Sequence, residues 1–570
     1  MAVDQVPKFP NDPMLVQLLR AAGHVSGTET IVCDVGGCEK TYLQLLADIL
    51  KTRDILRERL PQSAYDERNI LRDGYQYVGI LSRTGYEFLV AFFAIRAIGG
   101  VCMPLSSGVL PEEAQFFLAK AKSICVLAGK DRAEKAAEIH ATVAEKGHTP
   151  HFAAIPISSD AAPLGDIRVI IDHGLEMNPN GPGFVIFTSG TTGIPKGVVL
   201  PRRCLVPSDN FVPGCAVVTH RPVHWIGGAS SMLSAVLTGK RLHHLGEMAK
   251  PELVLAAFRD HRITHCSFTP TLLRKLRETM TGQTGRLSEE KRTEYSRCFR
   301  HLSVLRSVSG TVDRSTLGFW ADLTRLPFQN AYGGTEMGCS AIESMTTTEG
   351  VIGTPIPGVK VKLSEGDRGE IRIKSPGMMI CYLDDEKLTQ SALDEEGYYK
   401  SGDLAELRDG EYVFTGRSST DFVLFRGYRI PTLTVENSLL ELPYIAEACA
   451  VAVPHKEALQ LCGAVIRLRK NCAVPSETIT LSKIRSDLRA NLPQYMLPIL
   501  LRILKDGEDF SRTVSGKFIK PKVLKESFGT TEWFLVNDLP TGVEYCGSTV
   551  PMIIEAETKP WDWSGIQCAD

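Results

Sequence analysis

Short apolar segments that alternate with helical patterns over more than half of this chain constrain its fold most. A helical run that leads into a buried strand is predicted at 85–105, followed by the strand "SICVLAG" at 123–129. "GFVIFTSG" at 183–190 is a further strand, and the helical pattern "PELVLAAFRDHRI" at 251–263 precedes the strand "THCSFTP". Alternation of this kind predicts stacked α/β layers with largely parallel sheets.

The pattern changes from about residue 351. "GVKVKL", "GEIRIKS" and "AELRDGEYVFTGR", separated by Gly-Asp turns, predict short antiparallel hairpins and hence a small barrel-like β subdomain. After "GRSSTDFVLFRGYRI", an amphipathic helix at 435–442, two strands and a helix near 480–491 predict a compact α+β module.

A chain of 570 residues is too long for one compact core. We therefore expect a large N-terminal α/β domain over 1–416 that includes the β subdomain, and a small α+β domain over 417–528. The remaining segment, 529–570, shows no periodicity, and its role stays open between surface packing, association and disorder.

The composition is that of an ordinary soluble protein and excludes several partners. The net charge is −2, which argues against nucleic acid or an anionic membrane as the main ligand. The most apolar stretch, "EFLVAFFAIRAIGGVCMPL", contains Arg96 and is expected to be a buried helix rather than a membrane span. The 15 cysteines include no CxxC pair, so we expect reduced thiols in a cytoplasmic protein and no structural zinc site.

The segment Phe187 to Leu200 gathers hydroxyls, glycines and one lysine between two apolar runs. Backbone N–H groups of a glycine-rich turn can surround an anion, and hydroxyls and a cation add to such a site. A Walker loop is excluded because no Gly-Lys-Ser/Thr sequence follows the glycines. On local chemistry alone, a phosphate site and a solvated surface turn both remain open. The candidate phosphate ligands are Thr188, Ser189, Gly190, Thr191, Thr192, Gly193 and Lys196.

The string "TSGTTGIPKG" resembles the phosphate-loop signature of the adenylate-forming enzymes, which include acyl-CoA synthetases, luciferases and the adenylation domains of peptide synthetases. The other motifs of that superfamily follow in the expected order, and the resemblance covers about residues 30 to 525. They are "YGGTE" (332–336), "YKSGD" (399–403, with serine where threonine is usual), "GRSSTDFVLFRGYRI" (416–430), "LPQYMLP" (492–498) and "SRTVSGK" (511–517).

The resemblance implies an enzyme that joins a carboxylic acid to the AMP of ATP, releases pyrophosphate and passes the acyl group to a thiol. It implies that Lys517 contacts the carboxylate and the α-phosphate, and that Lys196 and the hydroxyl-rich loop hold the β- and γ-phosphates. Glu336 is the implied Mg²⁺ ligand, and Thr335 beside it the implied ligand of the α-phosphate.

The same resemblance assigns the nucleoside contacts. Tyr332 would stack on adenine, although a buried tyrosine is more often a core residue. Asp403 would accept hydrogen bonds from the ribose and Arg417 would donate to it, although an aspartate after glycine is as often a turn residue.

In this superfamily the small C-terminal domain rotates between the two half-reactions. Gly427 would then leave room for the pantetheine arm, and Arg429 would contact phosphates of coenzyme A. The segment between "GR" and "RGYRI" has eight residues, one more than is usual, so the hinge residue is either Ser419 or Thr420.

The thiol acceptor and the acid are less constrained. The 45 residues after residue 525 are too few for a carrier domain, so a stand-alone acyl-CoA ligase is favoured over an enzyme that loads a separate carrier protein or synthase. A non-catalytic nucleotide-binding relative is a third interpretation.

Short-dicarboxylate ligases tend to carry arginine at the position of Ala331, so an aliphatic or aryl acid is expected here. The implied acid pocket is Trp225, Gly227, Gly228, Ala331 and Met337, with Trp225 either shortening the pocket or packing as core.

Overall fold

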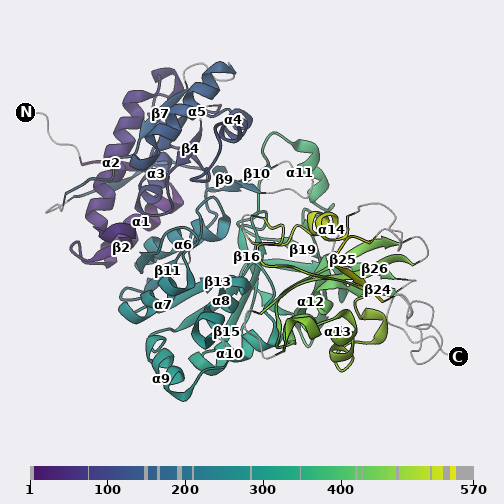
Figure 1. Cartoon of the computed structure of the whole chain (residues 1–570). Helices are drawn as coiled ribbons and strands as arrows, with labels where there is room; N and C mark the ends of the chain where they lie inside the picture. Colours follow the sequence, from purple (N-terminus) through teal and green to yellow (C-terminus); the bar gives the residue numbers. More distant parts are fainter. Residues whose placement is uncertain are drawn as a thin grey trace, which may run out of the picture.

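The structure is a computed structural model of the chain. It describes residues 6–74, 76–146, 152–162, 167–188, 195–207, 211–282, 286–346, 348–417, 422–425, 428–455, 458–469, 474–513, 516–529 and 539–546. Figure 1 shows a large N-terminal part, coloured purple to teal, and a smaller C-terminal part in green and yellow.

Two large sheets form the N-terminal part, with a two-stranded pair, β1 (Lys8–Asn11) and β8 (Ile170–Glu176), beside them. The seven-stranded sheet has the order β20 (Cys381–Tyr382), β10 (Lys196–Pro201), β9 (Pro182–Thr188), β5 (Val101–Pro104), β4 (Tyr77–Leu81), β6 (Cys125–Ala128) and β7 (Ala153–Pro156). The thirteen-stranded sheet has the order β18 (Lys360–Leu363), β19 (Arg368–Lys374), β21 (Tyr399–Arg408), β22 (Glu411–Arg417), β17 (Val351–Pro355), β16 (Cys339–Ser344), β15 (Phe328–Gly334), β14 (Val304–Val308), β13 (His265–Phe268), β11 (Ala216–Thr219), β12 (Arg241–His244), β2 (Thr30–Asp34) and β3 (Cys38–Thr41).

The central strands of both sheets are parallel, as the strand–helix alternation predicts. Neighbouring pairs from β2 through β12, β11, β13 and β14 to β15 are all parallel, and so are β4 with β5 and β6. The carboxyl ends of parallel strands meet at one edge of a sheet, which is where α/β folds place ligands.

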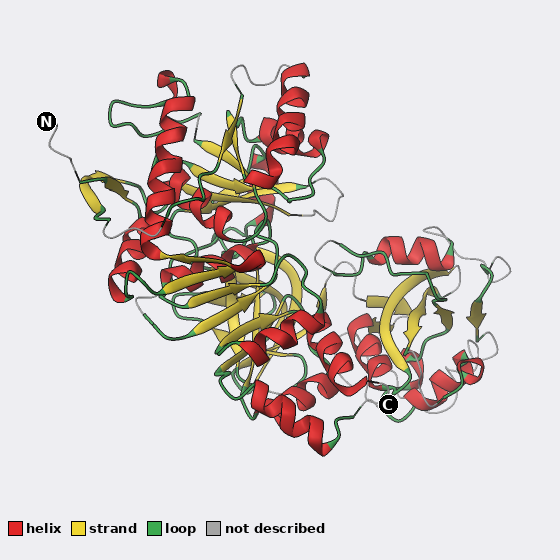
Figure 2. Cartoon of the chain, turned by 60° about the vertical axis from the view of Figure 1, so that its left-hand side comes forward, coloured by secondary structure: helices red, strands yellow, loops and turns green. Residues whose placement is uncertain are grey.

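Helices cover these sheets, as Figure 2 shows. The helix α3 (Tyr86–Arg96) is buried along almost its whole length, and no described helix is both long and apolar enough to cross a membrane. The N-terminal helices are α1 (Pro13–His24), α2 (Tyr42–Arg59), α3 (Tyr86–Arg96), α4 (Pro111–Lys120), α5 (Ala133–Glu145), α6 (Ile226–Leu237), α7 (Pro251–Asp260), α8 (Pro270–Thr281), α9 (Glu289–Cys298), α10 (Arg314–Thr324) and α11 (Glu386–Ala392).

The predicted hairpins are present in the strands β17 to β22, where the thirteen-stranded sheet becomes antiparallel. Their apolar residues form a separate small core that includes Ile352, Ile371 and Ile373. The β subdomain is thus continuous with the parallel sheet through β16 rather than detached from it.

The C-terminal part is a six-stranded sheet with its own apolar core between Val423 and Phe528. A strand from beyond residue 529 joins it: β28 (Val543–Tyr545) pairs antiparallel with β27 (Leu500–Ile503), and Glu544 accepts a hydrogen bond from the N–H of Leu481 at 2.7 Å. The α/β class with an α+β C-terminal part is therefore confirmed. The elements are β23 (Phe422–Phe425), β24 (Tyr428–Pro431), α12 (Thr432–Glu441), β25 (Ile445–His455), β26 (Leu459–Leu468), α13 (Leu481–Leu488), β27 (Leu500–Ile503), α14 (Lys520–Phe528) and β28 (Val543–Tyr545).

The two parts meet along α12 and the end of β26. Arg469, just after β26, pairs with Glu278 of α8, with 3.2 Å between Nη1 and Oε1. Glu349, in the turn between β16 and β17, hydrogen-bonds Asn437 of α12 and lies near Glu441. Burial, and then the charges of Glu441 and Asp313, raise the pKa of the Glu349 carboxyl to about 7.

Candidate active site

The hydroxyl-rich loop connects two antiparallel strands. Thr188 ends β9 and Lys196 begins β10; the two residues are directly paired, and the Thr188 hydroxyl donates to the Lys196 carbonyl at 3.5 Å. The hairpin therefore fixes both ends of the loop at the carboxyl edge of β9. The remaining predicted phosphate ligands, Ser189, Gly190, Thr191, Thr192 and Gly193, lie outside the described residues.

A tyrosine links this hairpin to the predicted metal ligand. The Lys196 ammonium lies 5.8 Å from the centre of the Tyr382 ring, and the Tyr382 hydroxyl donates to Oε1 of Glu336 at 3.1 Å. Tyr382 is held there because β20 pairs with β10, and Tyr399 contributes a further hydroxyl contact to it. Burial, and then the Glu336 carboxylate, raise the pKa of both phenols, which therefore stay protonated donors at neutral pH.

Close backbone packing positions the turn that carries Thr335 and Glu336. The main chain of Glu336 accepts a hydrogen bond from Met379 at 2.9 Å, and Thr335 itself is buried. Gly338 has φ of +81°, and a side chain there would meet the carbonyl oxygen of Gly377 at 2.2 Å. The segment that brings Tyr382 to β10 thus also fixes the position of Glu336.

The two predicted nucleoside ligands contact each other. The Tyr332 hydroxyl donates to Oδ2 of Asp403 at 2.7 Å, and the Asp403 side chain is buried. Ser401, the serine that replaces the usual threonine, accepts from the Asp403 N–H at 3.1 Å and donates to the Ile371 carbonyl at 2.7 Å. The serine hydroxyl therefore connects this turn to β19 as well as to the Asp403 backbone.

The predicted acid pocket lies between α6 and the sheet. Trp225 precedes α6, is half-buried and contacts the ring of His224 edge-on at 5.6 Å. A Cβ on Gly227 would meet Nη1 of Arg221 at 2.3 Å, and one on Gly228 would meet the Pro222 carbonyl oxygen at 2.0 Å. Gly228 is thus required by the backbone of the preceding loop, whereas a side chain at 227 would instead displace the Arg221 guanidinium.

The other two predicted pocket residues differ in their surroundings. Ala331 is buried on β15. Met337 is buried in the small core of the β subdomain, together with Ile342 and Ile371.

The C-terminal candidates lie on separate elements. Lys517 is exposed just before α14, and its N–H donates to the Thr513 hydroxyl at 3.1 Å. Arg417 pairs with Asp403 through the backbone of β22 and β21, and Arg429 is on β24; their side chains, and all of Gly427, lie outside the described part.

Sequence reasoning missed three residues of this region. Tyr399 is the first letter of the quoted "YKSGD" motif and could have been included with Asp403. Tyr382 carries no motif signal of its own, because its position depends on the pairing of β20 with β10. Arg221 is the first residue of "RPVHWIGG" (221–228), a segment that resembles the lining of the acyl tunnel, and could have been included with Trp225.

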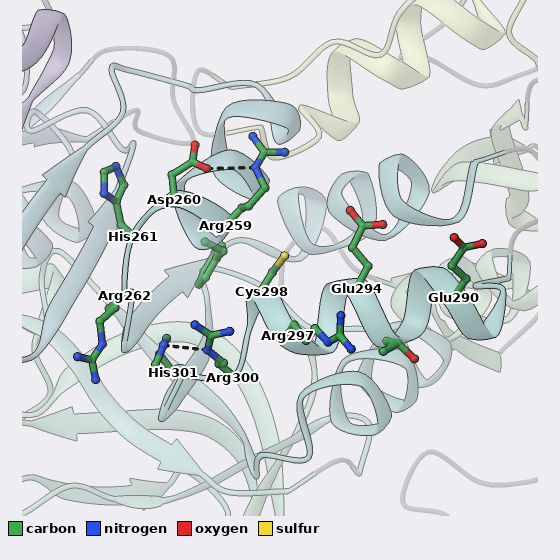
Figure 3. A pocket seen from close by; sticks show the side chains of 12 residues that line it. Arg259, Asp260, His261, Arg262, Glu290, Glu294, Arg297, Cys298, Arg300 and His301 are labelled. Carbon is green, nitrogen blue, oxygen red and sulfur yellow. Dashed lines mark hydrogen bonds and ion pairs between the residues drawn. The ribbon is translucent and has the colours of Figure 1, made fainter.

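A basic pocket of about 710 Å³ lies elsewhere, on α7, α9 and the loops that precede β13 and β14 (Figure 3). Arg259 there pairs with Asp260, and Arg300 donates to His301 at 3.0 Å. These loops are at the amino ends of the parallel strands, the edge opposite to Thr335, so this pocket is not part of the candidate active site.

The described residues predicted to bind the nucleotide thus lie on two α/β layers, several of them at the carboxyl edge of the strands. The family model "AMP-binding enzyme" matches residues 66–383, and "AMP-binding enzyme C-terminal domain" matches 434–517. The chain therefore belongs to the AMP-binding enzyme family, as its motifs predict.

Several relatives cover most of the chain. Acyl-CoA ligase oryP of Aspergillus oryzae is 32% identical over 532 residues, which are 91% of this chain and 93% of that protein. Malonate–CoA ligase of Arabidopsis thaliana is 26% identical, covering 80% of this chain and 78% of that protein. Among solved structures, ATP-bound MatB from Rhodopseudomonas palustris superposes with a TM-score of 0.71 at 20% identity, over 90% of this chain and 98% of that one. The family model and the named relatives confirm the expected class of enzyme, an AMP-forming acyl-CoA synthetase.

Proposed function

We propose that this protein activates a carboxylic acid with ATP and transfers the acyl group to coenzyme A. The observation that carries the proposal is the connected set of Lys196, Tyr382 and Glu336, which puts a cation and a carboxylate ligand at the mouth of the hydroxyl-rich loop. The relatives named acyl-CoA and malonate–CoA ligases support coenzyme A as the acceptor.

The first step needs no general base. A carboxylate with a pKa near 4 is ionised at neutral pH, so its oxygen can attack the α-phosphorus directly while the bond to pyrophosphate breaks. The barrier arises because two anions must approach each other. Cations and hydrogen-bond donors that face the developing charge lower it. Lys196 and the loop from Thr188 would hold the β- and γ-phosphates, Thr335 the α-phosphate, and Lys517 the attacking carboxylate.

The residues present fit a magnesium ion. Mg²⁺ bound with ATP takes one or two carboxylates and otherwise phosphate and water oxygens. Glu336 supplies one such carboxylate, oriented by the Tyr382 hydroxyl on Oε1, and no group of three or more metal-binding side chains occurs in the described ranges. When bound there, the ion would neutralise phosphate charge.

The nucleoside would be held by Asp403, Tyr332 and Arg417. Asp403 accepts one hydrogen bond from Tyr332 on Oδ2, and a carboxylate has further acceptor positions for ribose hydroxyls. Because the Tyr332 hydroxyl is committed to Asp403, the tyrosine would position the carboxylate as well as offer a ring face to adenine.

The second step requires a thiol to reach the acyl carbonyl, with AMP as the leaving group. We propose that the unit over 417–528 rotates relative to 1–416, so that Gly427 and Arg429 replace Lys517 at the site. The contact between Arg469 and Glu278 would then belong to one of the two orientations.

An ATP–pyrophosphate exchange assay with a broad acid library tests the first step. Exchange with at least one acid is expected, and its complete absence at saturating ATP and Mg²⁺ would overturn the proposal. Free coenzyme A is then added with the best acid, and acyl-CoA is measured by mass spectrometry. Exchange without acyl-CoA would instead indicate a separate carrier protein or synthase as the acceptor.

A further inference from the structure

Arg221 lies buried where the acid pocket is expected, between α6 and the thirteen-stranded sheet. Its side chain is 6% exposed, and its Nη2 donates to the Ser231 hydroxyl of α6 at 2.7 Å. Ser231 in turn donates to the Gly227 carbonyl at 2.9 Å, and Nη1 lies directly beside the Cα of Gly227. The guanidinium therefore fills the space that a side chain at 227 would occupy.

No described carboxylate forms an ion pair with this guanidinium. Burial lowers the pKa of this guanidinium to about 10, and among the described residues the Cys339 thiol raises that pKa while the Arg306 charge lowers it. Other buried arginines of the chain have a carboxylate or several backbone carbonyls as hydrogen-bond acceptors. Arg96 and Arg202 share the Asp12 carboxylate at 2.8 and 3.1 Å, and Arg485 donates to two backbone carbonyls.

The surrounding sheet face also carries an unsatisfied polar group. Pairing in register places Thr219 of β11 on the same face as Arg306 of β14, and Ala331 of β15 lies on that face too. The Thr219 hydroxyl is buried without a hydrogen-bond partner among the described residues. An apolar acyl chain would leave this hydroxyl unpaired and would offer no counter-charge to Arg221.

Burying a charge without a partner is costly, and a bound anion removes that cost. A guanidinium also presents paired N–H groups that match the two oxygens of a carboxylate. We propose that Arg221 binds a second carboxylate on the acid, so that the preferred substrate is a dicarboxylic acid activated at its other end. The inference rests on the proposed function, and it replaces the expectation of an aliphatic or aryl acid that Ala331 suggested.

This arrangement differs from an arginine at position 331. Because residue 331 is alanine, β15 carries no cation at that position. The positive charge is instead that of Arg221, in the loop after β11, whose guanidinium occupies the space left by the missing side chain of Gly227. Gly227 is thus a positioning residue for the Arg221 guanidinium.

The test compares three acids at each chain length in the ATP–pyrophosphate exchange assay: a dicarboxylate, its half methyl ester and the monocarboxylate, from three to ten carbons. For the wild-type protein at the best length, kcat/KM for the dicarboxylate should exceed that for the other two by roughly 30-fold or more, the scale expected for a buried charged pair. Equal or better use of the monocarboxylate or half ester by the wild type would overturn the inference while leaving the proposed function intact. Exchange with none of the acids would instead count against the proposed function.

Two variants tie the preference to the guanidinium. Arg221→Met should remove the preference for the dicarboxylate, and Gly227→Ala should reduce it because its Cβ displaces Nη1. Arg259→Met and Gly318→Ala are the matched controls, since Arg259 is on the basic pocket surface and a Cβ at Gly318 meets nothing within 4 Å. ATP affinity reports correct folding of each variant. A folded Arg221→Met protein that keeps the wild-type ratio between the acids would refute the assignment, and if that variant does not fold, an unchanged ratio in Gly227→Ala would do so.

Discussion

The Tyr332 hydroxyl donates a 2.7 Å hydrogen bond to Oδ2 of Asp403, which joins β15 of the central sheet to β21 of the hairpin region. These residues are 71 positions apart in the sequence and belong to two different motifs. The bond fixes one oxygen of a buried carboxylate, so the two motifs form a single nucleoside-binding unit rather than two independent contacts.

Tyr332→Phe should weaken ATP binding. Removal of a hydrogen bond to a charged group costs roughly 1.5–3 kcal/mol, so the Kd for ATP measured by calorimetry should rise about tenfold or more. Tyr412→Phe is the matched control, because its hydroxyl donates to the Val361 backbone carbonyl at 3.2 Å in the same sheet. Equal ATP affinity in the wild type and Tyr332→Phe would contradict the role of this bond.

Tyr382→Phe should increase the Mg²⁺ requirement. The lost hydroxyl orients the Glu336 carboxylate, and removal of such an orienting group commonly lowers metal affinity by about tenfold or more. The measurement is the Mg²⁺ concentration for half-maximal exchange at fixed ATP. Tyr398→Phe, whose ring contacts Lys362, serves as the control. An unaltered Mg²⁺ dependence would show that Tyr382 has only a packing role.

Lys517→Ala should lower the rate of exchange by roughly 100-fold or more while ATP affinity stays nearly unchanged, because the lysine would act on charge that develops in the transition state. Lys522→Ala, an exposed lysine on α14, should retain full activity. The assignment of the catalytic lysine fails if Lys517→Ala turns over at the wild-type rate.

Glu349→Gln should change how stability depends on pH. The folded-state pKa of Glu349 is raised to about 7 from a model-compound value of 4.5, so the folded protein holds this proton more tightly than the unfolded chain does. The protonated Glu349 carboxyl therefore contributes to the free energy of unfolding in full below about pH 4.5, and this contribution is lost as the pH rises toward 7.

The measurement is the difference in Tm between Glu349→Gln and the wild type across this range. It should grow in favour of the variant up to about pH 7 and then level off. Glu395→Gln, at an exposed carboxylate, should show no such trend. A difference that does not vary with pH would mean that Glu349 ionises normally at the interface.

Local patterns predicted the architecture because they depend on neighbours in the sequence. The apolar run at 85–105 indicated a buried helix and strand, which are α3 and β5. The pattern could not show how Arg96 is tolerated inside α3, since its partner Asp12 is 84 residues away. The same holds for the strand β28, whose three residues carry no pattern of their own and depend on the exposed edge of β27.

The motifs predicted much of the candidate site but not its connections. Lys196, Glu336, Tyr332 and Asp403 were all predicted as ligands from the sequence and remain predictions, whereas the contacts that join them pass through Tyr382 and through the pairing of distant strands. Arg221 was not singled out, although it begins the segment "RPVHWIGG" from which Trp225, Gly227 and Gly228 were predicted as pocket residues. Only the three-dimensional packing shows that its charge is buried.

The strand β28 has a practical consequence for anyone who shortens this protein. It covers the edge of β27, where Leu500 and Leu501 are buried. A version that stops at Gly529, where the helical pattern ends, would uncover a row of unpaired backbone groups beside apolar side chains, a surface that recruits other chains and precipitates. Trimmed versions for crystallisation should therefore extend through Cys546.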